Sequence, residues 1–366
     1  MGLQTSSSTS AAQQSTPAPV PVAKSYPNGN PNAAYNPPGA RNTDSCLALH
    51  LAGEVVHNYD SAGPAPGDIA FRWIRGSVVA ARNTDPRIQA ISYNEDTYIL
   101  RQNPCVHWEA PFTYLLFGNK GALLIDAGAT ANAAQYPLRK TVDAIVKRWC
   151  ELRGKRTVPL TVVLTSGEDV AQNRGLGQFV GRADTKVAPI ELAGMKEFHG
   201  FSGTWPSGVG TIDLGGRVVE AIPTPGTHKD GITFYDRYNG FLYTGDLLYP
   251  GRIQIANDRD YVASLTKLQL WSETHPVKWV MGGHVEMMFV PGRAYPRFAN
   301  NRPFEHVLQL ETPIIKEALD HATGMVGKPG VVFRTDFILL NRVGPDEQVY
   351  RTSPEMPDIP VPFWLP

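Results

Sequence analysis

Residues 162–179, VVLTSGEDVAQNRGLGQF, constrain the fold more than any other stretch of the chain. The stretch begins with three apolar residues, 162–164, which predict a short buried strand. It continues through a polar loop and ends at residues 174–177, RGLG, from which a short helix can start. In α/β proteins the loop at the carboxyl end of a strand commonly carries the reacting groups. We therefore expect the functional site at the end of this strand.

Length and composition are typical of a globular protein with a substantial core. The 366 residues are 42% hydrophobic and 19% charged, which suits one large domain or two ordinary ones. The 34 basic and 34 acidic residues balance, so we expect neither nucleic acid nor a membrane surface as a partner. No apolar stretch approaches the roughly 20 residues that a spanning helix needs. A small-molecule substrate is the expected partner, and the oligomeric state stays open.

The cysteines and the N-terminus bear on the compartment. Cys46, Cys105 and Cys150 are isolated, which is typical of reduced structural thiols; a single Cys46–Cys105 bridge is the alternative. No basic segment followed by an apolar one opens the chain, so no signal peptide is predicted. This pattern favours a cytoplasmic protein, although a secreted protein that has lost its signal would look the same.

Four regions follow from composition and periodicity. Residues 1–44 are rich in Ser, Pro and Asn and predict a disordered arm, and residues 45–109 a strand-rich extension. Residues 110–325 form the main domain, with a hairpin over 112–126 and helices over 138–149, 258–271 and 304–321. Residues 326–366 predict a late strand over 330–340 and a proline-rich tail.

Five segments of the main domain, taken in order, resemble the metallo-β-lactamase superfamily. They are residues 123–128, LLIDAG; residues 162–179, where that family has His-x-His-x-Asp-His; residues 223–230, PTPGTHKD, similar to its Pro-Gly-His segment; residues 242–251, LYTGDLLYPG; and residues 282–284, GGH. The resemblance covers about residues 110–290. It implies an α/β fold, a metallo-β-lactamase-like αβ/βα four-layer sandwich, over residues 110–325.

The resemblance also implies a reaction. In the family, histidine nitrogens and carboxylate oxygens hold zinc ions, which acidify a bound water and polarise a carbonyl or phosphoryl oxygen. The usual result is hydrolysis. We therefore expect an enzyme that acts on a small organic molecule, most simply a hydrolase of an ester, a thioester or a lactone.

The chain departs from the family in the loop that should hold the metals. No histidine lies between residues 165 and 175. Aligned forward from the strand, the family's two spaced histidines fall on Ser166 and Glu168. Aligned back from residues 175–179, they fall on Gly167 and Asp169. The loop's register therefore stays open.

The later ligand positions are only partly kept. The register aligned from the C-terminal side places Gln172 at the loop's last histidine. Thr227 occupies the histidine position of the Pro-Gly-His segment, with His228 one residue later. Asp246 and His284 stand where the family keeps ligands. Because two ligands cannot hold a dizinc centre in the ordinary way, we expect that centre to be absent.

Three functions fit these residues. In the first, Glu168, Asp169, His228, Asp246 and His284 form a rearranged catalytic site. One divalent ion is then held by Asp246, His284, His228 and Glu168, where the carboxylates favour Mn or Fe over Zn. In the second, the same groups are the acid and base of a metal-free lyase, isomerase or cyclase. In the third, the domain is a non-catalytic binding scaffold.

Four further residues complete the expected site. Asp126, at the end of residues 123–126, is predicted to be structural and to hold the ligand loop through backbone N–H groups. Tyr249, Arg252 and Tyr295 flank the surviving ligand positions and are candidates for substrate binding, because arginine suits a carboxylate or a phosphate. The alternative is that these three are ordinary loop residues.

Overall fold

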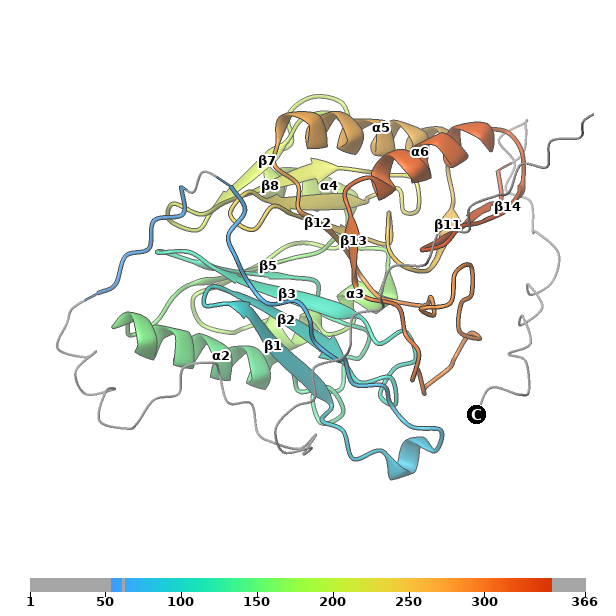
Figure 1. The fold of residues 1–366 in the computed structure, drawn as a ribbon. Coiled ribbons are helices and arrows are strands. Elements are labelled where there is room, and N and C mark those ends of the chain that lie inside the picture. Colours follow the sequence, from blue (N-terminus) through green and yellow to red (C-terminus); the bar gives the residue numbers. More distant parts are fainter. Residues whose placement is uncertain (1–53, 61–62, 344–366) are drawn as a thin grey trace, which may run out of the picture. The chain divides into compact units, whose positions relative to one another are not determined.

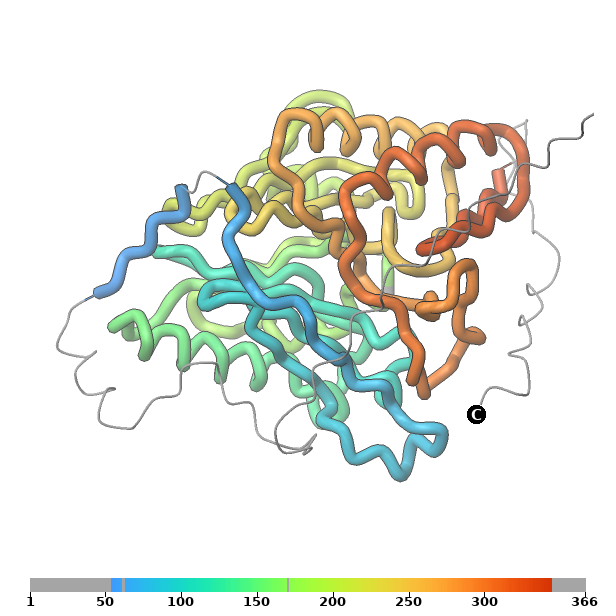
Figure 2. Tube along the Cα trace, viewed as in Figure 1, coloured from blue at the N-terminus to red at the C-terminus, as the bar shows by residue number. Residues whose placement is uncertain are grey.

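The computed structural model describes residues 54–60 and 63–343 (Figures 1 and 2). The predicted arm over residues 1–44, Cys46 and the proline-rich tail lie outside the described residues. Cys105 and Cys150 are free thiols. No helix within the described residues is long and apolar enough to cross a membrane.

The first of two six-stranded sheets is built from the N-terminal half of the chain. Its strand order is β1-β2-β3-β4-β5-β6; β1 to β4 pair antiparallel, and β4, β5 and β6 pair parallel. Two of its strands, β1 and β2, come from the region predicted as an N-terminal extension, so that region contributes to the main sheet. The strands are β1 (Ile88–Asn94), β2 (Thr97–Gln102), β3 (Phe112–Phe117), β4 (Ala122–Ile125), β5 (Leu160–Val163) and β6 (Thr185–Val187).

The second six-stranded sheet follows in the chain. Its order is β13-β12-β10-β9-β8-β7, and only β10 and β12 pair parallel. Apolar residues of both sheets share one core, in which Leu116 and Leu123 meet Phe234 and Met281. The strands are β7 (Gly210–Asp213), β8 (Val218–Pro223), β9 (Ile232–Asp236), β10 (Phe241–Gly245), β12 (Trp279–Gly282) and β13 (Gln309–Glu311).

Helices cover the outer faces of the two sheets, which gives the predicted four layers (Figure 1). The amphipathic helix α2 (Leu138–Arg153) packs Val142 and Trp149 on the first sheet. Helices α5 (Asp258–Thr274) and α6 (Ile314–Gly324) share a core with the second sheet. Two short helices, α3 (Val170–Asn173) and α4 (Leu192–His199), lie in the connections.

Two predicted elements of the C-terminal part were wrong. The helix expected over residues 304–321 begins only at Ile314, because residues 309–311 pair with β12 as strand β13. The late strand expected over residues 330–340 is a hairpin of β14 (Gly330–Phe333) and β15 (Ile338–Asn341). With β11 (Arg252–Ile255), this hairpin forms a three-stranded sheet.

A buried arginine joins the two six-stranded sheets. The side chains of Arg217 and Asp236 are fully buried and form an ion pair. The remaining Arg217 N–H groups donate to the backbone oxygens of Asp96 and Phe117 and to the hydroxyl of Thr97. All five guanidinium N–H groups therefore have acceptors, which offsets the cost of removing the charge from water.

Candidate functional site

The ends of two parallel strands bring Asp126 beside the loop after β5. Ile125 and Val163 are partners in the parallel pair β4–β5, so the residues that follow them meet at one edge. The Asp126 carboxylate accepts hydrogen bonds from the backbone N–H of Thr165 (2.8 Å) and from its hydroxyl. Burial raises the pKa of Asp126 to about 7, against the opposing effect of these bonds. Asp126 is thus placed to hold the start of the loop.

Two adjacent carboxylates of this loop have different surroundings. Asp169 is the N-cap of α3; its Oδ1 accepts from the Ala171 N–H at 2.8 Å. Its Oδ2 is buried and has no hydrogen-bond partner among the described residues. Glu168 is exposed and pairs with Lys229. Of the two expected acids, the structure therefore brings Asp169 into the cluster, and Glu168 points elsewhere.

Asp246 and His284 lie at the ends of two parallel strands of the second sheet. Gly245 and Gly282 are partners in the pair β10–β12, and the two site residues follow shortly after them. The His284 Nε2 lies 3.2 Å from Asp246 Oδ1. The ring of Tyr249 stacks on the His284 ring, with centroids 4.2 Å apart. This packing fixes the orientation of the imidazole.

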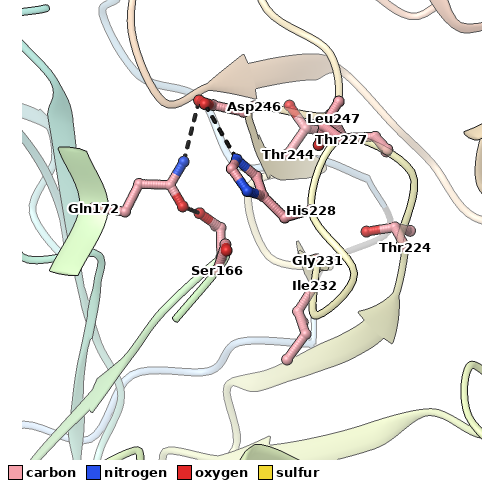
Figure 3. A pocket seen from close by; sticks show the side chains of 11 residues that line it. Ser166, Gln172, Thr224, Thr227, His228, Gly231, Ile232, Thr244, Asp246 and Leu247 are labelled. Carbon is pink, nitrogen blue, oxygen red and sulfur yellow. Dashed lines mark hydrogen bonds and ion pairs between the residues drawn. The ribbon is translucent and has the colours of Figure 1, made fainter. Parts of the chain in front are cut away.

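His228 completes the cluster from the loop between β8 and β9. Its Nε2 lies 3.6 Å from Asp246 Oδ2 and 3.9 Å from Asp169 Oδ2. Figure 3 shows the imidazole pointing at Asp246. Asp169, His228 and Asp246 each offer one ligand atom, and these atoms lie within 4.8 Å of one another. With His284 on the other oxygen of Asp246, four of the predicted site residues converge.

The four groups perturb one another's ionisation. Burial opposes the charge on Asp246, but His284 and His228 hold its pKa well below the usual value. Burial also disfavours the charged imidazoles, yet Asp246 raises the pKa of both His228 and His284 to about 9. Burial and the Asp246 charge raise the pKa of Asp169 to about 8. Asp246 is therefore the anion around which the cluster is built.

The arrangement fits one divalent ion. Asp169, His228 and Asp246 each offer one ligand atom to such an ion, and His284 lies 3.2 Å from the other oxygen of Asp246. Asp169 Oδ2 is buried without a hydrogen bond to any described residue and lies 3.9 Å from His228 Nε2, so a cation bound here would satisfy it. Two imidazoles and two carboxylates suit Zn, Mn or Fe.

Gln172 was not among the predicted site residues, although one loop register places it at a ligand position. Its amide nitrogen donates to Asp246 Oδ1 at 3.1 Å (Figure 3). Its amide oxygen accepts from the Thr165 hydroxyl. Gln172 therefore links Asp246 to Thr165 and Asp126. This contact favours the register aligned from residues 175–179.

Glu109 was also missed, since nothing in its local sequence distinguishes it. It lies on a loop whose backbone adjoins the site, because the Phe112 N–H donates to the Gly283 oxygen at 2.8 Å. Burial raises the pKa of Glu109, while the charge of His284 opposes that rise. Glu109 is therefore a further acidic group close to His284, besides Asp246 and Glu286.

The predicted substrate-binding residues have internal partners instead. Tyr249 and Tyr295 are buried, and the Tyr295 hydroxyl accepts from the Phe304 N–H at 2.6 Å. Arg252 pairs with Glu286 at 3.1 Å and donates to the Tyr295 backbone oxygen at 2.7 Å. The sequence could not show these partners, because they are distant in the chain. The role of the three residues in substrate binding stays a prediction.

A small pocket opens beside the cluster (Figure 3). Ser166, Gln172, Thr227, His228 and Asp246 are among the residues that line it. Its cavity volume is about 10 Å³, about the room of one water molecule. Pockets that enclose a whole ligand usually exceed about 300 Å³, so most of a substrate would lie outside this one.

Comparisons with known proteins show which proteins this chain resembles. The family model of the metallo-beta-lactamase superfamily matches residues 108–284. The acyl-coenzyme A thioesterase MBLAC2 of Gallus gallus is 33% identical over 94 residues, which are 25% of this chain and 33% of that protein. The chain thus matches only about a third of this curated relative.

The solved structures are more distant. A metallo-beta-lactamase from Pontibacter korlensis is 14% identical, covers 64% of this chain and 99% of its own, and has a TM-score of 0.44. An archaeal metallo-beta-lactamase superfamily protein from Sulfolobus tokodaii is 16% identical, covers 68% of this chain and 90% of its own, and has a TM-score of 0.39.

Proposed function

Residues 108–284 belong to the metallo-β-lactamase superfamily, and from this premise we propose that the chain hydrolyses an acyl thioester with one divalent metal ion. Asp169, His228, Asp246 and His284 are the proposed ligands. The observation that carries the proposal is that ligand atoms of Asp169, His228 and Asp246 lie within 4.8 Å of one another. The Asp169 oxygen among them is buried without a hydrogen bond to any described residue, and His284 lies beside Asp246. A thioester is preferred over an ester or a lactone because the curated relative is named as an acyl-coenzyme A thioesterase.

The ion would supply a Lewis acid that polarises a carbonyl oxygen and lowers the pKa of water. The chain's own residues hold the ligands in place. Gln172 orients one oxygen of Asp246, and Tyr249 orients the ring of His284. The N-cap bond of Asp169 occupies its Oδ1, so only Oδ2 is left for the ion. These contacts preorganise the ligands before substrate arrives.

The surface that follows His284 in the chain suits an acyl group. Phe289, Phe298 and Phe304 are 61%, 67% and 37% exposed, and Phe298 contacts Trp108 with ring centroids 5.0 Å apart. The loop that carries them is held by backbone bonds such as the one from the Phe289 N–H to the Phe304 oxygen. Because the pocket is small, an acyl chain would lie on such a surface outside it.

The metal-free acid–base enzyme is the second candidate. The observation that favours it is that the pKa of His228 and of His284 is raised to about 9, so both imidazoles carry protons at neutral pH. Proton donors beside an ionised Asp246 can serve as the general acid and base of a catalytic site. The two candidates differ in their dependence on an ion.

The test combines metal analysis with a thioester assay. Protein purified without a tag or a chelator is analysed by elemental mass spectrometry, and acyl thioester cleavage is measured before and after chelation. We expect about one ion per chain and cleavage that is lost on chelation and restored by Zn, Mn or Fe. Asp169→Ala and His284→Ala should lose both the ion and the activity.

Glu168→Ala is the matched control, because it removes the neighbouring carboxylate that pairs with Lys229. It should keep both the ion and the activity. Cleavage that survives chelation would favour the acid–base enzyme. A fully loaded protein without cleavage of short or long acyl thioesters would overturn the proposed reaction.

A further inference from the structure

One buried carboxylate lies behind the cluster and is not part of it. Asp230 is 0% exposed, on the loop between β8 and β9. Its Oδ1 accepts from the Ser166 hydroxyl at 2.7 Å. Its Oδ2 accepts from the backbone N–H groups of Gly167 (2.8 Å) and Glu168 (3.1 Å). All three donors belong to the loop that carries Asp169.

The hydroxyl of Ser166 is hydrogen-bonded both to Asp230 and to the backbone of Asp169. It donates to Asp230 and accepts from the backbone N–H of Asp169 at 3.3 Å. Two hydrogen bonds, through the Ser166 hydroxyl, therefore connect the backbone of Asp169 to Asp230. This backbone position decides where the N-cap side chain, with its unpartnered oxygen, is aimed.

Asp230 also belongs to the loop that presents His228. The backbone oxygen of His228 accepts from the N–H groups of Gly226 (3.1 Å) and Gly231 (3.4 Å), which closes this loop on itself. A side chain two residues after His228 thus binds three groups of the loop that presents Asp169. One carboxylate cross-links the two loops whose side chains approach each other to 3.9 Å.

The loop around Asp169 has little freedom to find other partners. A Cβ on Gly167 would lie 1.9 Å from the Ile190 backbone oxygen, so the backbone is packed tightly there. Gly167 is buried, so its N–H is shielded from bulk solvent. Without Asp230, this N–H would lose its acceptor inside the protein, which is unfavourable.

We infer that Asp230 is a positioning residue that sets the distance between Asp169 and His228 before any ion binds. The inference rests on the proposed function only where it concerns the metal. The cross-link itself is a property of the protein alone. Geometry, and not charge, is the proposed role of this carboxylate.

Two substitutions separate geometry from charge. In Asp230→Asn, the amide oxygen still accepts from the N–H groups of Gly167 and Glu168, and only the bond to Ser166 is lost. In Asp230→Ala all three bonds are lost. Ser166→Ala removes the bond to Asp230 and the bonds from the N–H groups of Glu168 and Asp169, and leaves the carboxylate in place. If the charge were decisive, the Asn and Ala variants would behave alike.

Asp258 offers a matched control. It is a buried carboxylate that accepts from the Gly327 N–H at 2.6 Å and from the Asn341 amide at 3.4 Å, away from the cluster. Asp258→Ala removes a buried tie of similar kind. A general loss of stability would appear in this variant as well.

The experiment uses the full chain at a temperature well below its unfolding. Amide hydrogen exchange is followed in residues 165–172 and 224–231, and the Kd for Zn²⁺ and Mn²⁺ is measured by competition with a chromogenic chelator. Asp230→Ala should speed exchange in both loops and weaken metal binding by about 10–100-fold. Asp230→Asn and Ser166→Ala should lie between it and the natural protein. Asp258→Ala should leave metal binding and the exchange of residues 165–172 unchanged; residues 224–231 are left out of this control, because Ala256 and Asn257 donate to the Gly226 oxygen.

Two results would overturn the inference. One is unchanged exchange in both loops of Asp230→Ala; the other is an equal loss of metal binding in Asp258→Ala. If Asp230→Ala does not fold, Asp230→Asn and Ser166→Ala carry the same comparison. A natural protein that binds neither ion would contradict the proposed function, and the exchange of the two loops would still decide the role of Asp230.

Discussion

Two buried groups of charges in this protein differ in how completely they are hydrogen-bonded. Between the sheets, Arg217 uses all five of its N–H groups, and its partner Asp236 is fully buried. In the cluster around Asp246, Asp169 Oδ2 and His284 Nδ1 are buried without a partner among the described residues. The first group is saturated and the second is not.

The difference separates stability from function. A buried polar group without a partner costs about 1–3 kcal/mol, so an incomplete group destabilises the fold unless something else binds there. A buried polar group without a partner is not by itself sufficient to mark a functional site. Both ring nitrogens of His199 are also buried without partners, but its ring neighbours are phenylalanines. A functional site needs several incomplete polar groups that face one point.

A substitution in the saturated group should have the largest effect on stability. Arg217→Met leaves Asp236 buried without its cation, and we expect the free energy of unfolding to fall by about 3–5 kcal/mol. The measurement is equilibrium unfolding in urea. Adding Asp236→Leu removes the stranded charge and should recover part of the loss. A loss below about 1 kcal/mol in the single variant would show that saturation does not mark a structural role.

His199 should make stability depend on pH. Burial lowers its pKa in the folded protein to about 4, from 6.5 in the unfolded chain. Between these values the unfolded state binds more protons, so stability falls as the pH falls from about 6.5 to about 4. The loss reaches at most about 3 kcal/mol.

The variant His199→Leu tests this assignment by urea unfolding at several pH values. The dependence between pH 4 and 6.5 should be smaller than in the natural protein by the contribution of one proton. An unaltered pH profile in the variant would assign the dependence to other groups.

A substitution in the incomplete group should reduce activity and leave stability nearly unchanged. Asp246→Asn removes the anion that His228 and His284 face, so we expect the rate of thioester cleavage to fall about 100-fold, or about 2.7 kcal/mol. The free energy of unfolding should change by less than about 1 kcal/mol. A fall in stability as large as that of Arg217→Met would remove the distinction between the two regions.

The exposed aromatic residues should give the smallest effect. Phe298→Ser removes one exposed ring that contacts Trp108, and we expect KM for a long-chain acyl thioester to rise about 3–10-fold with kcat unchanged. Val180→Ser is the control, because Val180 is also exposed but lies on another loop. An equal change in both variants would argue against an acyl-binding role for this surface.

The fold was confirmed more fully than the details of the site. The metallo-β-lactamase-like α/β fold was predicted because strand ends with Gly, Asp and His occur in the same order as in that family. Such strand ends are determined by short stretches of sequence, which can be recognised without the structure. Local pattern cannot decide whether Glu168 or Asp169 points inward, since this depends on the N-cap of α3. It also cannot show that Arg252 pairs with Glu286, because 34 residues separate them. The catalytic and metal-binding roles stay predictions.

The small pocket has a consequence for inhibitors. A cavity of about 10 Å³ holds about one water molecule, so only the tip of a head group reaches into it. A head group that binds the proposed ion would meet little else, and would therefore inhibit many enzymes with such an ion equally. Selectivity for this protein would then have to come from the part of the inhibitor that remains outside, on the surface around Trp108 and Phe298.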